Sequence, residues 1–368
     1  MTNSTKASLP SRRTVLQGAA FSAAALLLSS CAPGGTPAPK PSASGAGANA
    51  LDGQKLIAQV FGAATGERFS DAVYGPFASA NGVAVTQVPM HAEDALARML
   101  SETSNPQIDL YQFTGGQERV AKQKGLTAKI GDLAENEDIP DDFKDPDGQW
   151  VASAVLPEGI VYRTDKITRP PRSYKDFMNP EYEGHVAFPT ITNGWGMDFL
   201  VMLARTYGGG EKDIDPGFEA LEKLAAHAIV FKAASEMQTL FSQADVWIMP
   251  YDLSNAWRTA QAGLPVAFVS PAEGSPANLV TQVIAKESNH LEAARAAVQY
   301  SLRPDAQAKI ATDLRWFPTN SKTKLPADVA KDIRVGADAL KSLTQLDRTT
   351  MASNTAAWID RFNRTVVK

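Results

Sequence analysis

The sequence predicts an α/β fold of two lobes, each a mainly parallel sheet flanked by helices. Three observations support this prediction. The chain has 368 residues, which is enough for roughly two domains. Apolar runs of strand length alternate with segments of helical periodicity, as they do in mainly parallel sheets. Two extended apolar segments, residues 150–162 and 279–284, flank a self-contained run of strands and helices and are expected to cross between the lobes.

The first lobe is expected to begin with three strands and two helices in alternation. Each helical segment places apolar side chains on one face. Loops of small residues follow the first and third strands; such loops have room for a ligand and expose backbone N–H donors. Thr114 opens the loop after the third strand and is a candidate ligand contact. The expected strands span residues 56–61, 83–88 and 108–113, and the expected helices span residues 67–80 and 92–102.

An acidic stretch occupies residues 132–147. A charge run of this kind favours a solvated surface loop. A calcium loop at residues 145–148 is the alternative, although the spacing lacks the EF-hand pattern and its closing Glu.

The second lobe is expected to start with a strand at residues 186–188 and a helix at 197–207, joined by the loop 190–196. Asn193 and Trp195 lie in this loop and are candidate ligand contacts; Trp195 either stacks on the ligand or is a core aromatic. The three glycines after the helix form a turn, because they lack the context and the Lys-Ser/Thr of a phosphate loop. Further helices are expected at residues 218–226 and 235–243, around a strand at 229–231.

The stretch that follows has the order strand, helix, strand. Residues 246–249 and 266–269 are the expected strands, and Pro250 is expected to end the first. Ser254 or Asn255 is expected to cap the helix between them. Two parallel strands joined by one helix place both exit loops at one sheet edge, where open α/β sheets bind ligands.

Both exit loops carry a carboxylate, and the first also carries an aromatic side chain. Tyr251 and Asp252 lie in the first loop and Glu273 in the second, and all three are candidate ligand contacts. Alternatively, Asp252 caps the helix and Glu273 is a solvated turn residue. Glu158, in the first crossing segment, is a further candidate, with a hinge turn as its alternative.

Residues 1–30 predict an export signal. Arg12 and Arg13 stand in a segment similar to the twin-arginine motif, and the apolar stretch after them is too short to span a bilayer. Cys31 follows in a segment similar to the lipobox of bacterial lipoproteins, in which the cysteine is lipidated; a plain signal peptide with an incidental cysteine is the alternative. Residues 31–52, rich in Ala, Pro, Gly and Ser, are predicted to be a flexible tether.

Charge and motifs exclude several classes of function. The formal charge of −4 becomes −7 without the three basic residues of the export signal, which argues against a nucleic-acid partner. The four histidines are scattered and no hydrolase or dinucleotide motif is present. We therefore predict no catalytic residue, no metal and no cofactor, and a protein that is not an enzyme.

Five motifs occur in a fixed order along the chain: N-P-Q-I-D-L at residues 105–110, F-M-N-P-E-Y-E-G-H-V-A-F-P at 177–189, D-V-W-I at 245–248, G-L-P-V-A-F-V-S-P-A-E-G at 263–274 and W-F-P-T-N at 316–320. These motifs resemble those of bacterial extracellular solute-binding proteins, the capture components of ABC importers. The branch they are most similar to is the polyamine/iron/thiamine type. The resemblance covers about residues 55–325.

The resemblance implies a two-lobed, type 2 periplasmic-binding-protein-like fold with a ligand cleft between the lobes. Lobe 1 would comprise residues 53–157 and 276–368, and lobe 2 residues 158–275. It further implies a monomer, held to the membrane through Cys31 and facing the periplasm or the cell exterior. Such a protein would capture a small polar solute by lobe closure and deliver it to an ABC permease.

The resemblance also suggests the ligand class. Polyamine binders hold ammonium groups with carboxylates and stack the carbon chain on aromatic rings. No Arg or Lys lies in the three loops 190–196, 249–254 and 270–275, which favours an amine or a polyamine-like compound. The open alternatives are an anionic or metal-chelate ligand, an exported hydrolase that uses the same cleft, and a structural surface lipoprotein.

Overall fold

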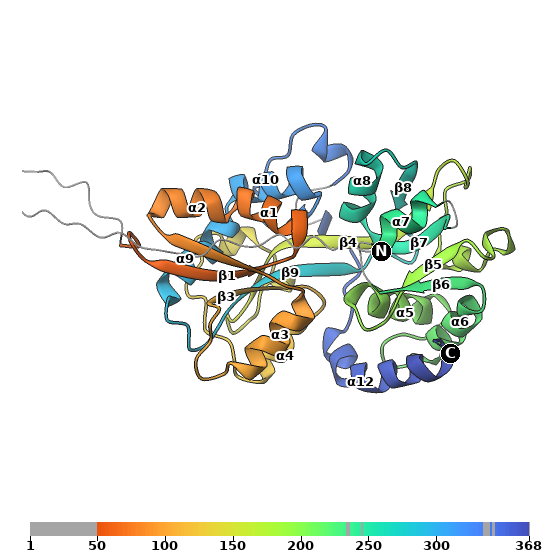
Figure 1. Cartoon of the computed structure of the whole chain (residues 1–368), viewed down its shortest axis with the longest axis horizontal. Coiled ribbons are helices and arrows are strands. Elements are labelled where there is room, and N and C mark those ends of the chain that lie inside the picture. The colour runs from red at the N-terminus through yellow and green to blue at the C-terminus, as the bar shows by residue number, and fades with distance from the viewer. Residues whose placement is uncertain (1–49, 233–235, 244–245, 334–338, 341–342, 368) are drawn as a thin grey trace, which may run out of the picture. The chain divides into compact units, whose positions relative to one another are not determined.

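The computed structural model describes residues 50–232, 236–243, 246–333, 339–340 and 343–367 (Figure 1). The export and anchoring predictions for Arg12, Arg13 and Cys31 lie outside the described residues, as do residues 31–49 of the predicted tether. Within the described ranges, no helix is long and apolar enough to cross a membrane.

Six strands form the first part of the sheet: β1 (Lys55–Val60), β2 (Ala84–Pro89), β3 (Leu110–Phe113), β4 (Val151–Arg163), β9 (Ala277–Ile284) and β10 (Phe317–Pro318). They join in the order β2-β1-β3-β9-β4, with β10 on β4. Strand β1 runs parallel to β2 and β3, whereas β9 runs antiparallel to β3 and β4. The strands predicted for this lobe are confirmed within two residues. The sheet contains both strand directions because β9, from late in the chain, lies between β3 and β4 and runs opposite to both.

Strand β4 links the two parts of the sheet and is buried along its whole length. Its first half pairs with β9, and from Glu158 onward it pairs with β7 (Ile248–Asp252) and β8 (Val266–Val269). The first predicted crossing segment is therefore one continuous strand. The second was expected to cross as well, but the pairs formed by β9 all lie in the first part of the sheet.

The second part of the sheet has the order β8-β4-β7-β5-β6, in which β5 spans Val186–Pro189 and β6 spans Ala228–Phe231. The strand-helix-strand unit is confirmed, but β4 lies between β7 and β8, so their two exit loops are not neighbours. The prediction that Pro250 ends the first of these strands is wrong. Strand β5 pairs with β7 only at Ile248, so the missing N–H of Pro250 breaks no hydrogen bond to β5.

Helices cover both parts of the sheet (Figure 1). The expected helix at residues 67–80 is two helices, because the backbone turns away from helical geometry at Val73 (φ −123°, ψ −66°). The α-helices are α1 (Ala63–Ala72), α2 (Tyr74–Asn81), α3 (Ala92–Ser101), α4 (Gln117–Gln123), α5 (Gly194–Thr206), α6 (Asp215–Ala225), α7 (Glu236–Ser242), α8 (Leu253–Gln261), α9 (Leu291–Ser301), α10 (Pro304–Leu314) and α12 (Arg348–Thr365). Short 3₁₀ turns span Asn136–Asp138, Asp141–Phe143, Tyr174–Met178, Pro180–Tyr182 and Val329–Lys331.

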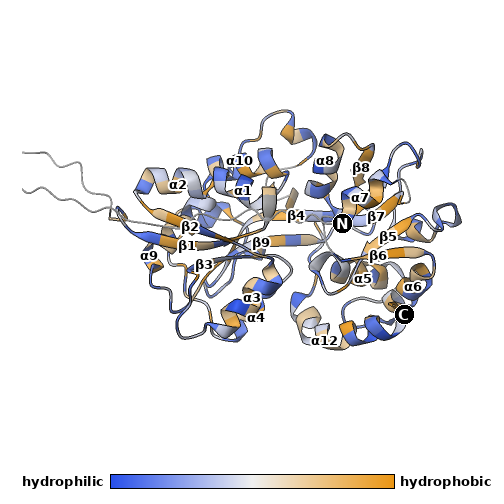
Figure 2. Cartoon of the chain, in the orientation of Figure 1, coloured by the Kyte–Doolittle hydropathy of each residue, from blue (hydrophilic) through white to orange (hydrophobic). Residues whose placement is uncertain are grey.

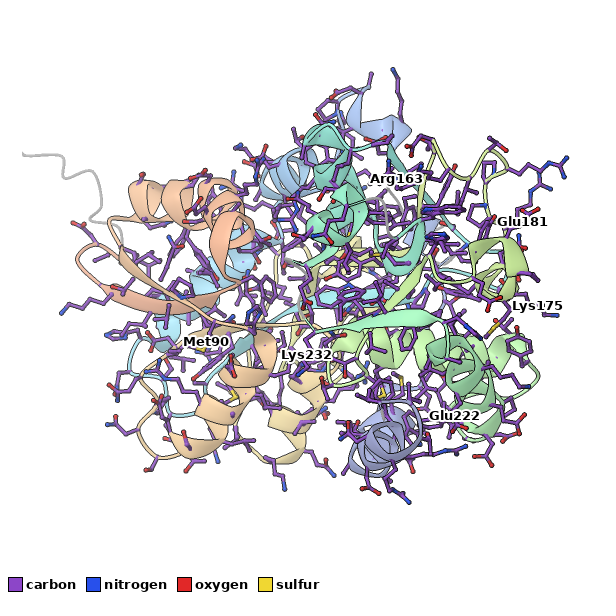
Figure 3. All side chains as sticks on the ribbon, turned by 45° about the vertical axis from the view of Figure 1, so that its right-hand side comes forward. Met90, Arg163, Lys175, Glu181, Glu222 and Lys232 are labelled. Carbon is purple, nitrogen blue, oxygen red and sulfur yellow. The ribbon has the colours of Figure 1, made fainter. Side chains whose placement is uncertain are left out.

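Two large apolar cores correspond to the two parts of the sheet. The first joins β1, β3 and β9 to α9 and α10, and the second joins β5 to α5, α6 and α12. Met351, Trp358 and Phe362 place α12 in the second core, although residues 276–368 were assigned to lobe 1. The strands are mainly hydrophobic, α12 carries both polar and apolar residues, and charged side chains such as Lys175 and Glu181 lie at the surface (Figures 2 and 3). The lobe boundaries stay a prediction, and this packing favours moving α12 to lobe 2.

Candidate functional site

Loops that follow strands of both parts of the sheet enclose a cavity of about 140 Å³. The first part contributes the segments after β1, β2 and β3, and the second contributes the first turns of α5 and α8. The lining residues are Phe61, Gly62, Thr65, His91, Thr114, Leu156, Trp195, Ser254, Asn255, Arg258 and Trp316. The predicted contacts Thr114 and Trp195 are therefore brought together here.

Arg258, on α8, spans this cavity. Its Nη1 donates to Thr65 Oγ1 at the start of α1 (2.8 Å), and its Nη2 donates to Asn255 Oδ1 (2.5 Å). The sequence analysis did not predict Arg258 as a site residue, because it considered charged side chains only in the exit loops. The available signal was its spacing, since a residue three positions after Asn255 lies on the same helix face.

Asp252 lies directly behind this arginine and has no exposed surface. Its Oδ1 accepts from the backbone N–H of Asn255 (2.8 Å), and its Oδ2 accepts from Asn255 Nδ2 (2.6 Å). Asp252 is thus the N-cap of α8, a role expected for Ser254 or Asn255. Burial raises the pKa of its carboxyl group, and the bonds from Asn255 oppose that shift. Asp252 therefore has the capping role that was given as its alternative, and it does not line the cavity.

Tyr251 and Trp195 stack on each other, with ring centroids 5.1 Å apart and planes at 12°. Tyr251 is buried in β7 opposite Gly159, where burial raises the pKa of its hydroxyl, and it backs Trp195 without lining the cavity. The Trp195 ring faces the cavity. Its Nε1 is buried and has no hydrogen-bond partner among the described residues.

Glu273 and Glu158 lie outside the cavity lining. Glu273 accepts a hydrogen bond from Ser173 Oγ and one from the backbone N–H of Tyr174 (3.3 Å), so it holds the start of a 3₁₀ turn. Glu158 accepts from Asn278 Nδ2 (3.0 Å) on the neighbouring strand β9. Burial first, and then the nearby Asp198, raise the pKa of Glu158 well above its ordinary value. Glu158 lies where β4 changes partners, but within a continuous strand, so the hinge turn given as its alternative is not present at this residue.

Asn193 lines a second cavity, of about 300 Å³, together with Gly115, Gly116 and Arg348. Asn193 caps α5, because its Oδ1 accepts from the backbone N–H of Gly196 (2.9 Å). Both apolar and polar side chains of α3, α4 and α12 form the other walls, including the carboxylate of Glu93.

A buried ion pair lies beside this second cavity. Both terminal nitrogens of Arg348 bond to the carboxylate of Asp198, with Nη2 to Oδ2 at 2.7 Å, and Nη2 also reaches the carbonyl of Ala277 (3.4 Å). Asp198 has no exposed surface. Glu118 lies nearby, accepts from Thr281 Oγ1 (3.4 Å) and has its pKa raised by burial. Arg348 was missed because it enters from a helix that the sequence placed in the other lobe.

The described part of the chain contains no site at which the protein itself could bind a metal ion. The calcium-loop alternative fails because the ammonium of Lys122 lies 2.6 Å from both Asp145 Oδ1 and Asp147 Oδ2, where a cation would bind. Across the described ranges, no group of three His, Cys, Asp or Glu side chains could hold a metal ion.

A Ser-His-Asp group beside the first part of the sheet bears on the hydrolase alternative. Ser288 Oγ and His290 Nδ1 both contact Asp109, at 2.8 Å and 3.0 Å. A catalytic triad instead requires the serine hydroxyl to contact the histidine ring. This group lies outside the cavity, whose described lining residues include Ser254 and His91 but no Asp or Glu.

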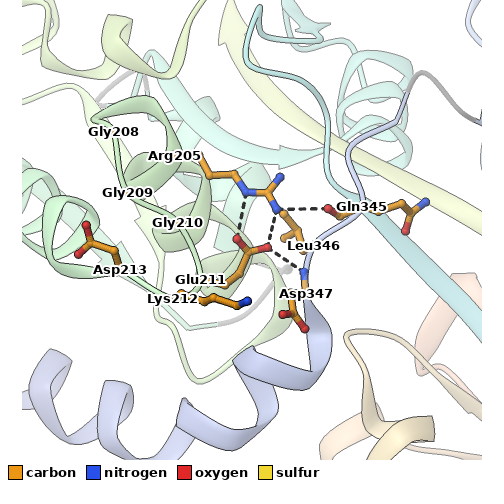
Figure 4. Close-up of a pocket in the computed structure, with 10 residues that line it drawn as sticks. All are labelled: Arg205, Gly208, Gly209, Gly210, Glu211, Lys212, Asp213, Gln345, Leu346 and Asp347. Atoms are coloured by element: carbon orange, nitrogen blue, oxygen red, sulfur yellow. Dashed lines mark hydrogen bonds and ion pairs between the residues drawn. The ribbon is translucent and has the colours of Figure 1, made fainter.

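A larger hollow of about 600 Å³ lies beside the glycine turn after α5 (Figure 4). Glu211 accepts from Arg205 Nη2 (2.5 Å) and from the backbone N–H of Asp347 (2.7 Å). These bonds tie the turn to the start of α12. The carboxylate of Glu211 therefore has a structural role. This agrees with the prediction that the three glycines form a turn and not a phosphate loop.

The mixed α/β fold, with a cavity built from strand-exit loops of both parts, defines a two-lobed binding protein for small molecules. The chain belongs to the bacterial extracellular solute-binding protein family, whose model matches residues 106–342. This confirms the resemblance inferred from the sequence.

Three known proteins illustrate the relationship. The chain is 24% identical over 196 residues to the spermidine/putrescine-binding periplasmic protein of Escherichia coli K12, covering 52% of this chain and 54% of that protein. The chain thus spans about half the length of the curated relatives it matches. An extracellular solute-binding protein from Bordetella parapertussis shares the fold with a TM-score of 0.73 and 22% identity, over 85% of this chain and 99% of that one. AfuA from Actinobacillus pleuropneumoniae, solved with fructose-6-phosphate bound, has a TM-score of 0.72 and 15% identity, over 86% and 99%.

Proposed function

We propose that the protein is the solute-binding component of an ABC importer, which captures a small polar solute and delivers it to a permease. The observation that carries this proposal is the 140 Å³ cavity, whose lining comes from both parts of the sheet. The bond from Arg258 to Thr65 joins those parts across the cavity. A solute held there would contact both parts at once and stabilise their closed arrangement.

The same cavity argues for binding and against turnover. The described residues of its lining offer hydroxyl groups, one guanidinium and aromatic rings, but no carboxylate to act as a general base or to orient His91. Membership of a solute-binding family agrees with a role that is not enzymatic.

The amine class predicted from the sequence is retained as a second candidate. The name of the Escherichia coli relative and the Trp195 ring support it. The positions of Asp252, Glu273 and Glu158 weaken it, because all three carboxylates are engaged elsewhere. The fructose-6-phosphate bound to AfuA is consistent instead with an anionic solute.

We further propose that Cys31 is lipidated and that residues 31–52 tether the binding unit, as a monomer, to a membrane of the cell envelope, facing the periplasm or the cell exterior. The order of twin arginine, apolar stretch and cysteine supports this proposal. A tethered receptor would remain within reach of its permease.

A thermal-shift screen of the exported chain against a metabolite collection tests the proposed function. A compound that binds the folded state raises the melting temperature, because it adds RT ln(1 + [L]/Kd) to the free energy of unfolding. We expect stabilisation by one compound class, and recovery of the compound unchanged after incubation. A collection in which nothing stabilises the protein would contradict a binding role, and conversion of the compound would favour an enzyme.

A further inference from the structure

We infer that the solute carries an oxyanion group, a carboxylate or a phosphate, which binds beside Arg258 and the first turn of α1, with a flat apolar portion against Trp195 and Trp316. This inference rests on the proposed function of the same cavity. It replaces the ammonium group expected from the sequence with a group of opposite charge.

Charge in the cavity lining is the first argument. Among the described residues that line the cavity, Arg258 is the only permanently charged side chain, and none of them is Asp or Glu. The guanidinium donates to Thr65 Oγ1 and Asn255 Oδ1, which are neutral oxygens, and it forms no direct ion pair with a described residue. Hydrogen bonds from a guanidinium to a carboxylate or phosphate are stronger than those to neutral oxygens, so an oxyanion would displace Thr65 favourably.

Asp252 is a nearby charge that could oppose this preference. Both of its oxygens are occupied by Asn255, which stands between Asp252 and Arg258. Asn255 uses its amide N–H groups on Asp252 and its amide oxygen on Arg258. The buried carboxylate therefore orients the guanidinium across the cavity through a neutral side chain, and does not itself reach the solute.

Backbone donors at the start of α1 are the second argument. Gly62 is the N-cap of this ten-residue helix and has no side chain to accept from its free N–H groups. Gly62 and Thr65 both line the cavity, on the side to which Arg258 donates. An uncapped helix N-terminus favours a negative group, and here it faces the same space as the guanidinium.

The aromatic walls define the rest of the solute. Phe61 and Trp316 pack edge to face with centroids 6.1 Å apart, and Trp195 lines the same cavity. A cavity of about 140 Å³ with these walls suits a single flat ring or a chain of similar size that bears one anionic group.

Four probes of matched shape test the inference by calorimetry on the exported chain. They are benzoate, phenyl phosphate, the neutral benzamide and the cationic benzylamine. We expect benzoate or phenyl phosphate to bind at millimolar concentration or below, and more tightly than the other two. Preference for benzoate or for phenyl phosphate would identify the oxyanion. Equal or tighter binding of benzylamine overturns the inference, and so does failure of both anions to bind.

Variants assign the preference to Arg258. Arg258→Gln keeps hydrogen-bonding capacity without charge. We expect it to weaken binding of the preferred anion about 10- to 100-fold and to change the affinity for benzamide much less. Thr65→Val removes the bond between α8 and α1 but leaves the charge, so the anion should remain preferred. Arg303→Gln changes an exposed arginine paired with Asp305 and should change nothing. Equal losses for anion and benzamide in Arg258→Gln would overturn the inference.

The two proposals fail separately. If the metabolite screen selects an amine, the inference is wrong and solute binding stands. If the screen selects nothing, the proposed function fails, whatever the four probes show.

Discussion

The backbones of Gly115 and Gly194 approach each other where the two parts of the sheet meet. A β-carbon placed on Gly194 would lie 3.7 Å from the Cα of Gly115, and one placed on Gly115 would lie 3.6 Å from the Cα of Gly194. Gly115 follows β3 and Gly194 opens α5, so this contact joins one loop from each part. Contacts of this length leave room for a methyl group, and we expect a larger side chain at residue 194 to meet the facing loop.

Side-chain size at residue 194 should therefore control closure. Gly194→Ala is expected to keep the solute affinity of the wild type, because its Cβ makes ordinary van der Waals contacts and φ at this position is not left-handed. Gly194→Leu should clash with Gly115, and overpacking of this kind costs about 1–3 kcal/mol, or about 5- to 150-fold in affinity. Calorimetry with a compound selected by the screen would measure this difference.

The melting temperature without solute is the control for this pair of variants. The two parts can separate slightly to relieve the clash, so Gly194→Leu should melt close to the wild type in the absence of solute. If Gly194→Leu binds as tightly as Gly194→Ala, the contact does not limit closure.

The buried pair of Arg348 and Asp198 should be the most costly polar contact to break. Arg348→Met leaves the carboxylate of Asp198 buried without its partner, and such a loss typically costs about 3–5 kcal/mol of unfolding free energy. Adding Asp198→Asn to Arg348→Met should recover part of that loss. Urea denaturation measures all three proteins. Arg364→Met is the matched control on the same helix, since its pair with Asp360 is exposed and should be worth less than about 1 kcal/mol.

Most strands were predictable because their apolar runs are local features of the chain. The runs at residues 56–61 and 266–269 match β1 and β8 within a residue. What the sequence could not show is pairing between distant segments. The return of β9 beside β3, and the packing of Trp358 of α12 in the second core, depend on contacts across more than one hundred residues.

The site was predictable only in its location. The loops that carry Thr114 and Trp195 were predicted from the strand ends, and both residues line one cavity. Whether the carboxylate of Asp252 faces a solute or the end of its own helix depends on the backbone at that residue, which is extended (φ −89°, ψ 157°) as N-cap residues are. Arg258 was overlooked because its side chain reaches into the cavity from within a helix.

Asp252 offers a direct test of its capping role. Asp252→Ala removes the acceptor for the Asn255 N–H and should lower the free energy of unfolding by about 0.5–2 kcal/mol. Asp252→Asn retains an acceptor and should lose less. Urea denaturation at neutral pH distinguishes the two variants. Equal stability of Asp252→Ala and the wild type would show that the cap contributes nothing.

The export prediction concerns residues outside the described structure. Replacement of Arg12 and Arg13 by Lys should block translocation, because the twin-arginine pathway reads that pair. Cys31→Ser should release the protein from membranes, since the serine cannot take the lipid. Cell fractionation and mass analysis for acyl chains measure both effects. A Cys31→Ser protein that still carries acyl chains would refute the lipoprotein proposal.

Glu158 should make the stability of the protein depend on pH. Burial and the nearby Asp198 raise the pKa of this carboxyl group well above the value of about 4.3 expected in the unfolded chain. Between these two pKa values the folded state binds a proton that the unfolded state has lost. The resulting stability is fully present below the unfolded pKa and is lost as pH rises through the folded pKa.

Glu158→Gln separates this contribution from those of other groups. Glutamine mimics the protonated acid, because it can still accept from Asn278 and can donate to Asp198. The variant and the wild type should have similar free energies of unfolding near about pH 5, and the variant should become the more stable one as pH rises toward about 8. Urea titrations across this range measure the difference between them. Glu181→Gln, at an exposed carboxylate, serves as the control, and parallel pH profiles for Glu158→Gln and the wild type would mean that Glu158 does not hold its proton in the folded protein.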